Sequence, residues 1–544
     1  MNLSNSRLRI VPILGSFFLL ALLATPSAAA SPTISKPSVT PVLHTATVNS
    51  IVSLLDPSFD PNLVGGVPFC SSGSLGTILC YPPSFLKKAY DFPSTWGGHG
   101  LDGTGQTIVI VDAFGSPTIQ SDLNTFDTTF GLPPTTVTIL CGPTWTGSPT
   151  DNCPVKTISD LTNAPNALLC GATGWAEETT LDVTMAHALA PGAHIVLLVA
   201  NDCFDTNLYG AEQAIVSQRA YRGSIMSQSF GEPDDLVTCT ALGPTNTCIS
   251  YDPTLLNLPN SVFQTATKYH WTIIASSGDD GANEDARVLG TYELTPSFPS
   301  TSPLVLAAGG TQGNPYGGQY GSAPGPGGTF SCGAFKFCNT GLVWINGGLN
   351  GCGTAVRPGV PSSCVPVYYG GEATWNEALA FGSVGYASGG GISTLYALPF
   401  YQQSVARHLP NTLLGVQVKA TGRLVPDVSF NSAVYGGVLA YLGFLGRWGV
   451  FGGTSAASPA WAGIMALVNQ AHGSPMGWVN PAIYSIQGQN SQGRSPFHDI
   501  TSGNNADCSG YCGEDGYVAG RGYDLTTGWG TPDVSSLIQA LAYS

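Results

Sequence analysis

The sequence predicts an α/β fold in which helices cover both faces of a parallel β-sheet. Short runs rich in Val, Ile and Leu recur along the chain, as expected of strands that are buried on both faces. They span residues 107–114, 194–200, 224–230, 271–278 and 303–310. Longer stretches of helical character separate them, including residues 177–189 and 208–218. Strands that alternate with helices in this way are typical of parallel sheets.

The composition excludes several classes of protein. With 544 residues the chain is long enough to bury a large core. Only 9 % of its residues are charged, against roughly 25 % in ordinary soluble domains, and the net charge is −15. Because nucleic-acid binding draws on clustered Lys and Arg, we expect no nucleic-acid partner. In an acidic medium the carboxylates would be neutral and few cations would remain to repel one another.

The first thirty residues predict export. Arg7 and Arg9 precede an apolar run at residues 10–24, and small residues follow up to Ala30. This order is typical of a signal peptide spanning residues 1–30, so we expect a secreted, extracellular protein. A membrane anchor is the alternative, but the apolar run is shorter than the roughly 20 residues that span a bilayer. We therefore expect no membrane association after the signal peptide is removed.

The rest of the chain divides into a leader and one large domain. Residues 31–85 form a Pro- and Ser-containing leader, and the domain covers residues 86–544. Within it, residues 312–371 are rich in Gly and Cys, which predicts a disulfide-tied surface insertion. The fourteen Cys fit an oxidising compartment. We expect neighbours in sequence to pair, although sequence alone cannot fix connectivity, and a structural zinc site is the weaker alternative. The expected pairs are Cys70/Cys80, Cys141/Cys153, Cys170/Cys203, Cys239/Cys248, Cys332/Cys338, Cys352/Cys364 and Cys508/Cys512.

A serine within the C-terminal third of the chain is the first candidate catalytic residue. An apolar run ends in two glycines before Thr454 and Ser455, and a helical stretch follows. Ser455 is therefore expected at a strand-to-helix turn, where free N–H groups and the helix dipole favour a developing oxyanion. We expect Pro459 to lie close to the first turn, where a missing N–H costs least. A plain N-cap serine is the structural alternative.

Two acids on a predicted helix are the second candidate. Four helical residues turn about 400°, so Glu178 and Asp182 lie about 40° apart on one face, whereas Glu177 points about 140° away from Asp182. The alternative is a solvated pair on an exposed face, but the rest of this helix is mostly apolar. Asp112 follows the first strand as the acid of a subtilisin would, yet no suitable His accompanies it. We expect structural roles for His187 and His194.

These segments resemble the sedolisin family, also called serine-carboxyl peptidases or peptidase S53. The likeness covers about residues 85–544 and includes Gly-Thr-Ser-Ala-Ala-Ser-Pro around Ser455, Glu-x-x-x-Asp before Ala-Pro-Gly-Ala, and Ser-Gly-Asp at residues 277–279. Further matches lie at residues 227–233, 298–311, 388–393 and 423–429. The resemblance implies a subtilisin-like parallel sheet flanked by helices. It also implies a serine-type peptidase, either an endopeptidase or a tripeptidyl-peptidase.

The resemblance implies a mechanism that works in acid. A carboxylate still accepts a proton at pH about 3–4, where a histidine is already a cation. Glu178 would take the proton of Ser455, Asp182 would hold Glu178, and a protonated Asp279 would donate to the oxyanion. Protein or peptide substrates would add as a strand near residues 227–231 and the Gly-rich loop at residues 388–391. We expect the enzyme to be a monomer.

The resemblance also implies one structural calcium ion. A calcium loop is expected over residues 498–532, with carboxylate and carbonyl oxygens, which Ca²⁺ prefers. The expected ligands are Asp499, Ile500, Gly520, Gly522 and Asp524. By spacing alone, Asp and Gly residues here are more typical of simple turns.

Two departures from the family pattern stand out. Residues 31–85 are too few for the long folded prodomain of sedolisins, so they would be a truncated propeptide, and Gly452 stands where the family commonly has Ser. An exported, catalytically inactive peptidase-like protein that binds at the cell surface is the alternative function. A subtilisin-like enzyme is a third, which would depend on a His and work best near neutral pH.

Overall fold

The computed structural model describes most of the chain. The described residues are 40–48, 51–55, 69–72, 76–142, 153–243, 246–284, 293–313, 324–325, 328–329, 369, 371–377, 386–487, 494–506 and 515–542. The expected signal peptide and most of the expected insertion at residues 312–371 lie outside them. Within the described part, no helix combines the length and apolar character needed to cross a membrane.

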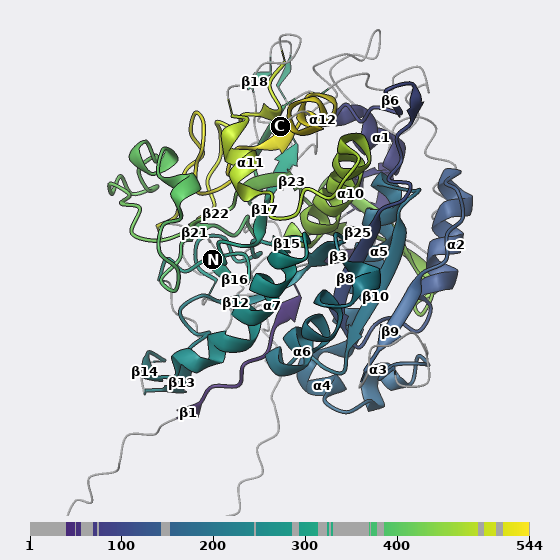
Figure 1. Ribbon diagram of the computed structural model, residues 1–544, viewed down its shortest axis with the longest axis horizontal. Coiled ribbons are helices and arrows are strands. Elements are labelled where there is room, and N and C mark those ends of the chain that lie inside the picture. Colours follow the sequence, from purple (N-terminus) through teal and green to yellow (C-terminus); the bar gives the residue numbers. More distant parts are fainter. Residues whose placement is uncertain are drawn as a thin grey trace, which may run out of the picture.

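An eight-stranded sheet forms the centre of the molecule and confirms the predicted α/β class (Figure 1). Its neighbouring strands run parallel except at β20, which is antiparallel to β17. In spatial order the strands are β9 (Thr138–Cys141), β10 (His194–Ala200), β8 (Thr107–Ala113), β11 (Ile225–Gln228), β15 (Thr272–Ser276), β17 (Leu306–Gly313) and β20 (Glu372–Thr374), with β23 (Val428–Asn431) also paired to β17. The central strands are buried, as their unbroken Val and Ile content requires.

The predicted strand over residues 224–230 is interrupted. It divides into β11 and β12 (Phe230–Pro233), and Ser229 lies between the two. β12 leaves the main sheet and pairs with β16 (Ser297–Phe298) and β2 (Thr47–Val48) instead. The break therefore takes the chain out of the central sheet, and Ser229 at the break contacts Ser455.

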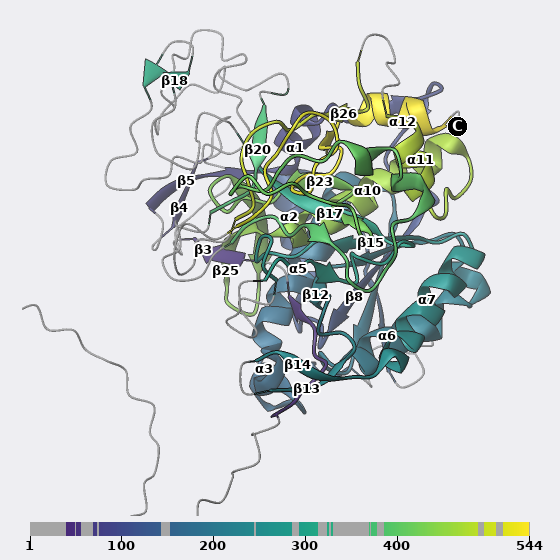
Figure 2. The same cartoon turned by 90° about the vertical axis from the view of Figure 1, so that its left-hand side faces the viewer.

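Helices cover both faces of the sheet. α5 (Ala172–Leu189) packs against α10 (Thr454–His472), and both contact central strands. α6 (Asp205–Val216) packs on α7 (Asn257–Lys268), and Figure 2 shows this pair on the opposite side of β8 from α5. The other helices are α1 (Pro83–Ala89), α2 (Ile119–Phe130), α3 (Asp160–Asn163), α4 (Ala167–Cys170), α11 (Asn480–Ser485) and α12 (Val534–Ala542).

The leader is built into the body of the protein. A five-stranded sheet has the order β3 (Ile51–Leu54), β25 (Arg447–Gly452), β24 (Gly437–Leu442), β5 (Gly76–Tyr81) and β4 (Phe69–Ser72). Three of these strands come from the leader. Leader strand β1 (Thr40–Pro41) pairs with β13 (Cys239–Leu242), and β2 pairs with β12. The leader strands β1, β2, β3 and β5 are thus held by backbone pairing with distant segments.

Short strands and disulfides complete the structure. Four expected cysteine pairs are confirmed, Cys70–Cys80, Cys141–Cys153, Cys170–Cys203 and Cys239–Cys248. The other three pairs lie outside the described residues. The remaining strands are β6 (Thr95–Trp96), β7 (His99–Gly100), β14 (Cys248–Tyr251), β18 (Pro324–Gly325), β19 (Gly328–Thr329), β21 (Gly391–Ile392), β22 (Leu424–Val425), β26 (Phe497–His498) and β27 (Thr531–Pro532).

Candidate active site

Ser455 lies at the strand-to-helix turn that the sequence predicts. β25 ends at Gly452, Gly453 has a φ of 98°, and α10 begins at Thr454. A positive φ of this size favours glycine, so Gly453 is needed for the turn. At Gly452 a Cβ atom would lie 2.6 Å from the carbonyl oxygen of Ser432, which leaves no space for a side chain. Gly452, which stands where the family commonly has Ser, therefore lies in a tightly packed turn.

Pro459 lies inside α10, so the expectation that it lies close to the first turn is wrong. A residue here would normally donate its N–H to the carbonyl of Ser455, four residues earlier, but proline has no N–H. The hydroxyl of Ser229 donates to that carbonyl instead, at 3.4 Å, and the hydroxyl of Ser455 donates to the carbonyl of Ser229 at 3.4 Å. The proline thus leaves an acceptor that ties the helix start to the break after β11.

The two acids of α5 lie beside the start of α10. Glu178 and Asp182 are fully buried, which excludes the solvated pair. Ser229 lies close enough to Asp182 to lower the pKa of that carboxyl, and it also contacts Ser455. Farther along, Gly463 of α10 lies against α5 near its C-terminus. The two helices therefore run in the same direction, and Ser455 lies at the level of the acidic pair.

Burial and mutual repulsion dominate the electrostatics of these acids. Burial raises the pKa of Asp182 well above its ordinary value, and the neighbouring Asp112 and Glu178 raise it further, whereas hydrogen bonding from Ser229 lowers it. Burial raises the pKa of Asp112 to about 7, and hydrogen bonding from Thr179 opposes that rise. Interacting carboxyls of this kind retain protons together at acidic pH.

Asp112 is the group whose place in the site the sequence reasoning missed. It comes from the end of β8, is fully buried, and acts on Asp182 across the sheet-helix interface. From the sequence, Asp112 was a candidate only for the acid of a subtilisin. Its position at the carboxyl end of a central strand was the available signal, because ligand and catalytic groups in α/β sheets gather at that edge.

Asp279 is hydrogen-bonded to Thr454, the residue before the candidate nucleophile. It follows β15 and is buried. Its Oδ1 accepts hydrogen bonds from the backbone N–H of Thr454 at 2.7 Å and from the Thr454 hydroxyl at 2.8 Å. The Gly-rich loop supports this turn, because the N–H of Gly389 donates to the carbonyl of Gly278. The structure therefore brings Ser455, Glu178, Asp182 and Asp279 into one region.

The two histidines considered as bases make contacts of other kinds. His187 Nε2 lies 3.1 Å from Oδ1 of Asp127 and 3.1 Å from the carbonyl oxygen of Pro133. His194 Nε2 lies 2.8 Å from the hydroxyl of Thr138 on the neighbouring strand. Both rings thus link secondary-structure elements, in agreement with the structural roles expected for them.

The leader lies against both segments that contact the candidate nucleophile. Strand β2 pairs with β12, which begins one residue after Ser229. Strand β3 follows two residues after β2 and pairs with β25, which ends three residues before Ser455. Part of the edge at residues 227–231, where we expect substrate to add, is therefore occupied by the chain itself. Ser455 is fully buried in this arrangement.

In the expected calcium loop, the two acids accept hydrogen bonds from nearby glycines. Both carboxylate oxygens of Asp499 lie 3.0 Å from the N–H of Gly522, and Oδ2 of Asp524 accepts from the N–H of Gly520 at 2.9 Å. Burial raises the pKa of Asp524 to about 6 and also raises that of Asp499. Asp524 is buried and Asp499 is exposed. Carboxylate oxygens are ligands that Ca²⁺ accepts, so the chemistry of these two side chains is compatible with the ion.

The chain is similar in sequence to several known peptidases. The chain is 29 % identical to kumamolisin of Bacillus sp. (strain MN-32) over 461 residues, which cover 85 % of this chain and 63 % of kumamolisin. It is 32 % identical to sedolisin of Pseudomonas sp. (strain 101) over 286 residues, covering 52 % and 37 % of the two chains. Tripeptidyl-peptidase 1 of Rattus norvegicus is 28 % identical over 294 residues, covering 52 % and 39 %. The chain thus spans less than two thirds of the length of these relatives.

A solved structure shares the fold. Pseudomonas sedolisin, a serine-carboxyl proteinase complexed with two molecules of pseudo-iodotyrostatin, superposes with a TM-score of 0.60 at 24 % identity, covering 86 % of this chain and 100 % of that one. No protein-family model matches the chain. In sequence the chain is thus similar to kumamolisin, sedolisin and tripeptidyl-peptidase 1, and it shares the fold of Pseudomonas sedolisin.

Proposed function

We propose that this chain is an exported serine-carboxyl peptidase that hydrolyses peptide bonds of protein substrates at acidic pH. The observation that carries the proposal is the burial of Glu178 and Asp182 on α5 at the level of Ser455, at the start of α10. A base must lie close to the proton that it accepts, and carboxyl groups are the ionisable side chains in this grouping. A carboxylate base works in acid, where an imidazole would already be protonated.

In the proposed first step, Glu178 accepts the proton of the Ser455 hydroxyl as Oγ attacks the carbonyl carbon of the substrate. The carbonyl oxygen becomes an oxyanion in a tetrahedral intermediate. When this intermediate collapses, the C–N bond breaks, Glu178 returns the proton to the leaving amine, and an acyl-enzyme remains on Ser455. Water then attacks the ester, again with Glu178 as base, and the serine is released.

Asp182 and Asp112 would position the base and keep protons in the cluster. The pKa of each is raised, so both are largely protonated at pH about 4. A neutral Asp182 can donate a hydrogen bond to an ionised Glu178, which stabilises the one negative charge that the base needs. As the pH rises, further ionisation adds like charges within a buried cluster, which is unfavourable.

Asp279 would stabilise the oxyanion. Its Oδ1 already accepts two hydrogen bonds from Thr454, so Oδ2 is the oxygen on which a proton would be retained. In acid that O–H can donate to the oxyanion beside Ser455, which a carboxylate cannot do. One donor of this kind is worth about 2.7–4 kcal/mol in the transition state.

A calcium ion would have a structural role. Asp499 and Asp524 would hold it, together with carbonyl oxygens of Ile500, Gly520 and Gly522. When bound, the ion would neutralise two carboxylates and link the two halves of the loop. Asp524 Oδ1 also accepts hydrogen bonds from Thr526 and Thr527, which orients its second oxygen.

The test is a pH–rate profile of the purified secreted chain on a denatured protein substrate. We expect a bell with its maximum well below pH 6. Ser455→Ala and Glu178→Gln should each lower kcat by on the order of 10⁴-fold or more. Glu177→Gln is the matched control, because Glu177 is adjacent in sequence yet only half-buried, and it should retain activity. Mass spectrometry of the products would separate internal cleavage from release of N-terminal tripeptides.

Two outcomes would overturn the proposal. Activity that peaks near neutral pH and survives Glu178→Gln would remove the carboxylate base. The absence of hydrolysis at every pH, with the parent chain no better than Ser455→Ala after removal of the leader, would favour the inactive surface-binding alternative.

A further inference from the structure

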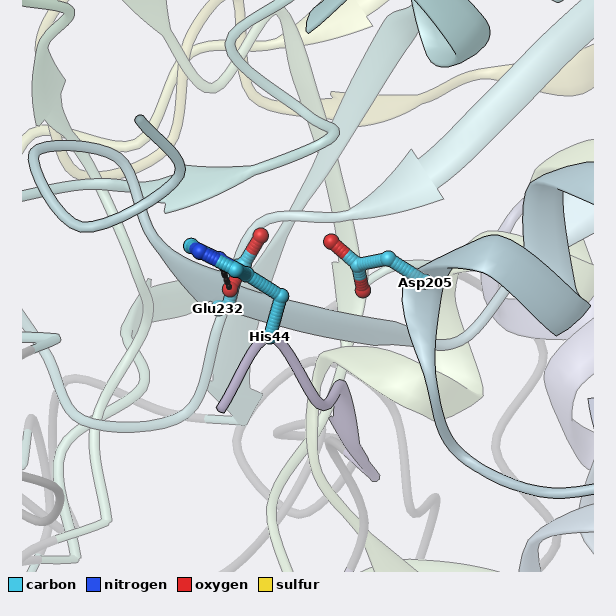
Figure 3. A group of neighbouring side chains, drawn as sticks. All are labelled: His44, Asp205 and Glu232. Atoms are coloured by element: carbon cyan, nitrogen blue, oxygen red, sulfur yellow. Dashed lines mark ion pairs between the residues drawn. The ribbon is translucent and has the colours of Figure 1, made fainter. Parts of the chain in front are cut away.

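A second cluster of ionisable groups lies where the leader meets the body of the protein. Figure 3 shows His44 from the leader, Asp205 from the start of α6 and Glu232 from β12, with the side chains turned toward one another. One nitrogen or oxygen atom from each of the three lies within 4.8 Å of the others. His44 Nδ1 is 3.7 Å from Glu232 Oε2. These residues are far apart in sequence and none has a role in the proposed catalytic steps, although Glu232 lies on β12, one residue beyond the expected substrate edge.

The cluster is buried and its polar atoms are poorly satisfied. The side chain of Glu232 is 8 % exposed and shares a hydrogen bond with Asp205, while its Oε1 has no other donor group beside it. Both ring nitrogens of His44 are also buried without a hydrogen bond. Buried polar atoms nearly always have partners. A ligand bound by all three residues would satisfy the atoms that lack one.

The charges indicate the kind of ligand. Burial raises the pKa of Asp205 well above its usual range, and the nearby Glu232 raises it further. Burial raises the pKa of Glu232 to about 7. Two carboxyl groups that face each other in a buried site resist ionisation unless a positive charge lies between them. A divalent cation would supply that charge and would also bind the imidazole.

We propose that His44, Asp205 and Glu232 form a binding site for a divalent transition metal of the zinc class. One imidazole nitrogen with two carboxylate oxygens is a donor set that zinc accepts, whereas Ca²⁺ binds oxygen ligands. Zinc bound at about 2.0–2.2 Å to each atom requires the three side chains to close by about 1 Å, and water would complete a tetrahedron. The His44 side chain is 18 % exposed, so the cluster lies near the surface of the protein.

The metal would fasten the leader across the candidate active site. His44 lies three residues before β2, the leader strand that pairs with β12. A bond from this histidine to a metal held by Asp205 and Glu232 would secure that strand from its N-terminal side. The effect on catalysis rests on the proposed function. The metal site itself does not, because it does not involve Ser455.

The experiment uses the full secreted chain carrying Ser455→Ala, so that neither autolysis nor failure of the proposed activity affects the result. Calcium is kept saturating, and zinc chloride is titrated by calorimetry at pH about 7. We expect one zinc ion per chain. His44→Ala and Glu232→Gln should each weaken binding by more than about 100-fold, since even a residue that only supports a ligand is worth about 10–100-fold. His99→Ala, at an exposed histidine, is the matched control and should bind as the parent does.

Two further measurements do not depend on how the variants fold. Zinc should slow hydrogen exchange of the peptide covering residues 40–48 in the parent chain. X-ray absorption of the zinc-loaded parent should show one imidazole, oxygen neighbours and no sulfur. Equal zinc affinity in folded His44→Ala, unchanged exchange at residues 40–48, or a sulfur-ligated ion would each overturn the proposal.

Discussion

Replacing Asp112 by Asn should make the protein more stable at neutral pH while leaving its stability in acid nearly unchanged. Burial raises the pKa of Asp112 from 3.8 to about 7. For an acid whose pKa is raised by folding, the folded state binds its proton more tightly than the unfolded state. Its contribution is therefore fully present below pH about 4 and is lost as the pH rises toward 7.

The magnitude follows from the same pKa values. Each pKa unit corresponds to about 1.36 kcal/mol, so ionising Asp112 in the folded state costs about 4 kcal/mol by pH 7. An asparagine side chain at this position has no charge at any pH and avoids this cost. Because Asp112 also raises the pKa of Asp182, the substitution should lower that second pKa as well.

The assay is urea unfolding of Ser455→Ala chains with and without Asp112→Asn, at pH about 3, 5 and 7. The advantage of the Asp112→Asn variant should grow by about 4 kcal/mol across this range. Asp160→Asn serves as a control of opposite sign, because hydrogen bonds lower the pKa of the exposed Asp160 and its substitution should cost most at neutral pH. An advantage that stays constant or shrinks as pH rises would refute the assignment of Asp112 to a buried, charge-repelling cluster.

Other changes test separate parts of the site. Asp279→Ala should lower kcat about 10²–10³-fold with little change in KM, as expected for a lost oxyanion donor, and a large rise in KM with kcat intact would contradict that role. Gly452→Ala should destabilise the fold by about 1–3 kcal/mol, because the new Cβ would lie 2.6 Å from the Ser432 carbonyl oxygen. Thermal unfolding measures this change. An unchanged unfolding temperature would mean that the turn can shift to accommodate the methyl group. Removing calcium with a chelator should lower the unfolding temperature of the parent but not of Asp524→Asn, and equal losses in both would place the ion elsewhere.

The sheet and its helices could be predicted because they are local patterns. The strand at residues 194–200 matches the prediction at both ends. α5 begins five residues before its predicted start, because Thr173 and Gly174 are poor helix formers that only packing makes helical. The break at Ser229 has no Gly or Pro at the break itself, and the contacts of Ser229 with Asp182 and Ser455 are long-range and cannot be seen in the local sequence.

The serine and the two α5 acids could be found from spacing and resemblance, but their electrostatic environment could not. Asp112 is 70 residues from Asp182 in sequence, and only the fold brings β8 and α5 together. The same is true of the leader, whose strand β3 pairs with β25 nearly 400 residues later. Local periodicity contains no information about such partners, because any exposed strand edge can accept any extended segment.

The position of β2 and β3 has a consequence for anyone who measures inhibitors of this protein. A free peptide must compete with a rival that is covalently attached and therefore present at an effective concentration on the order of millimolar. Affinities determined on the intact chain will then appear weaker than those determined after the first 55 residues have been cut away. Comparing the two preparations would measure how firmly the protein holds its own N-terminal segment.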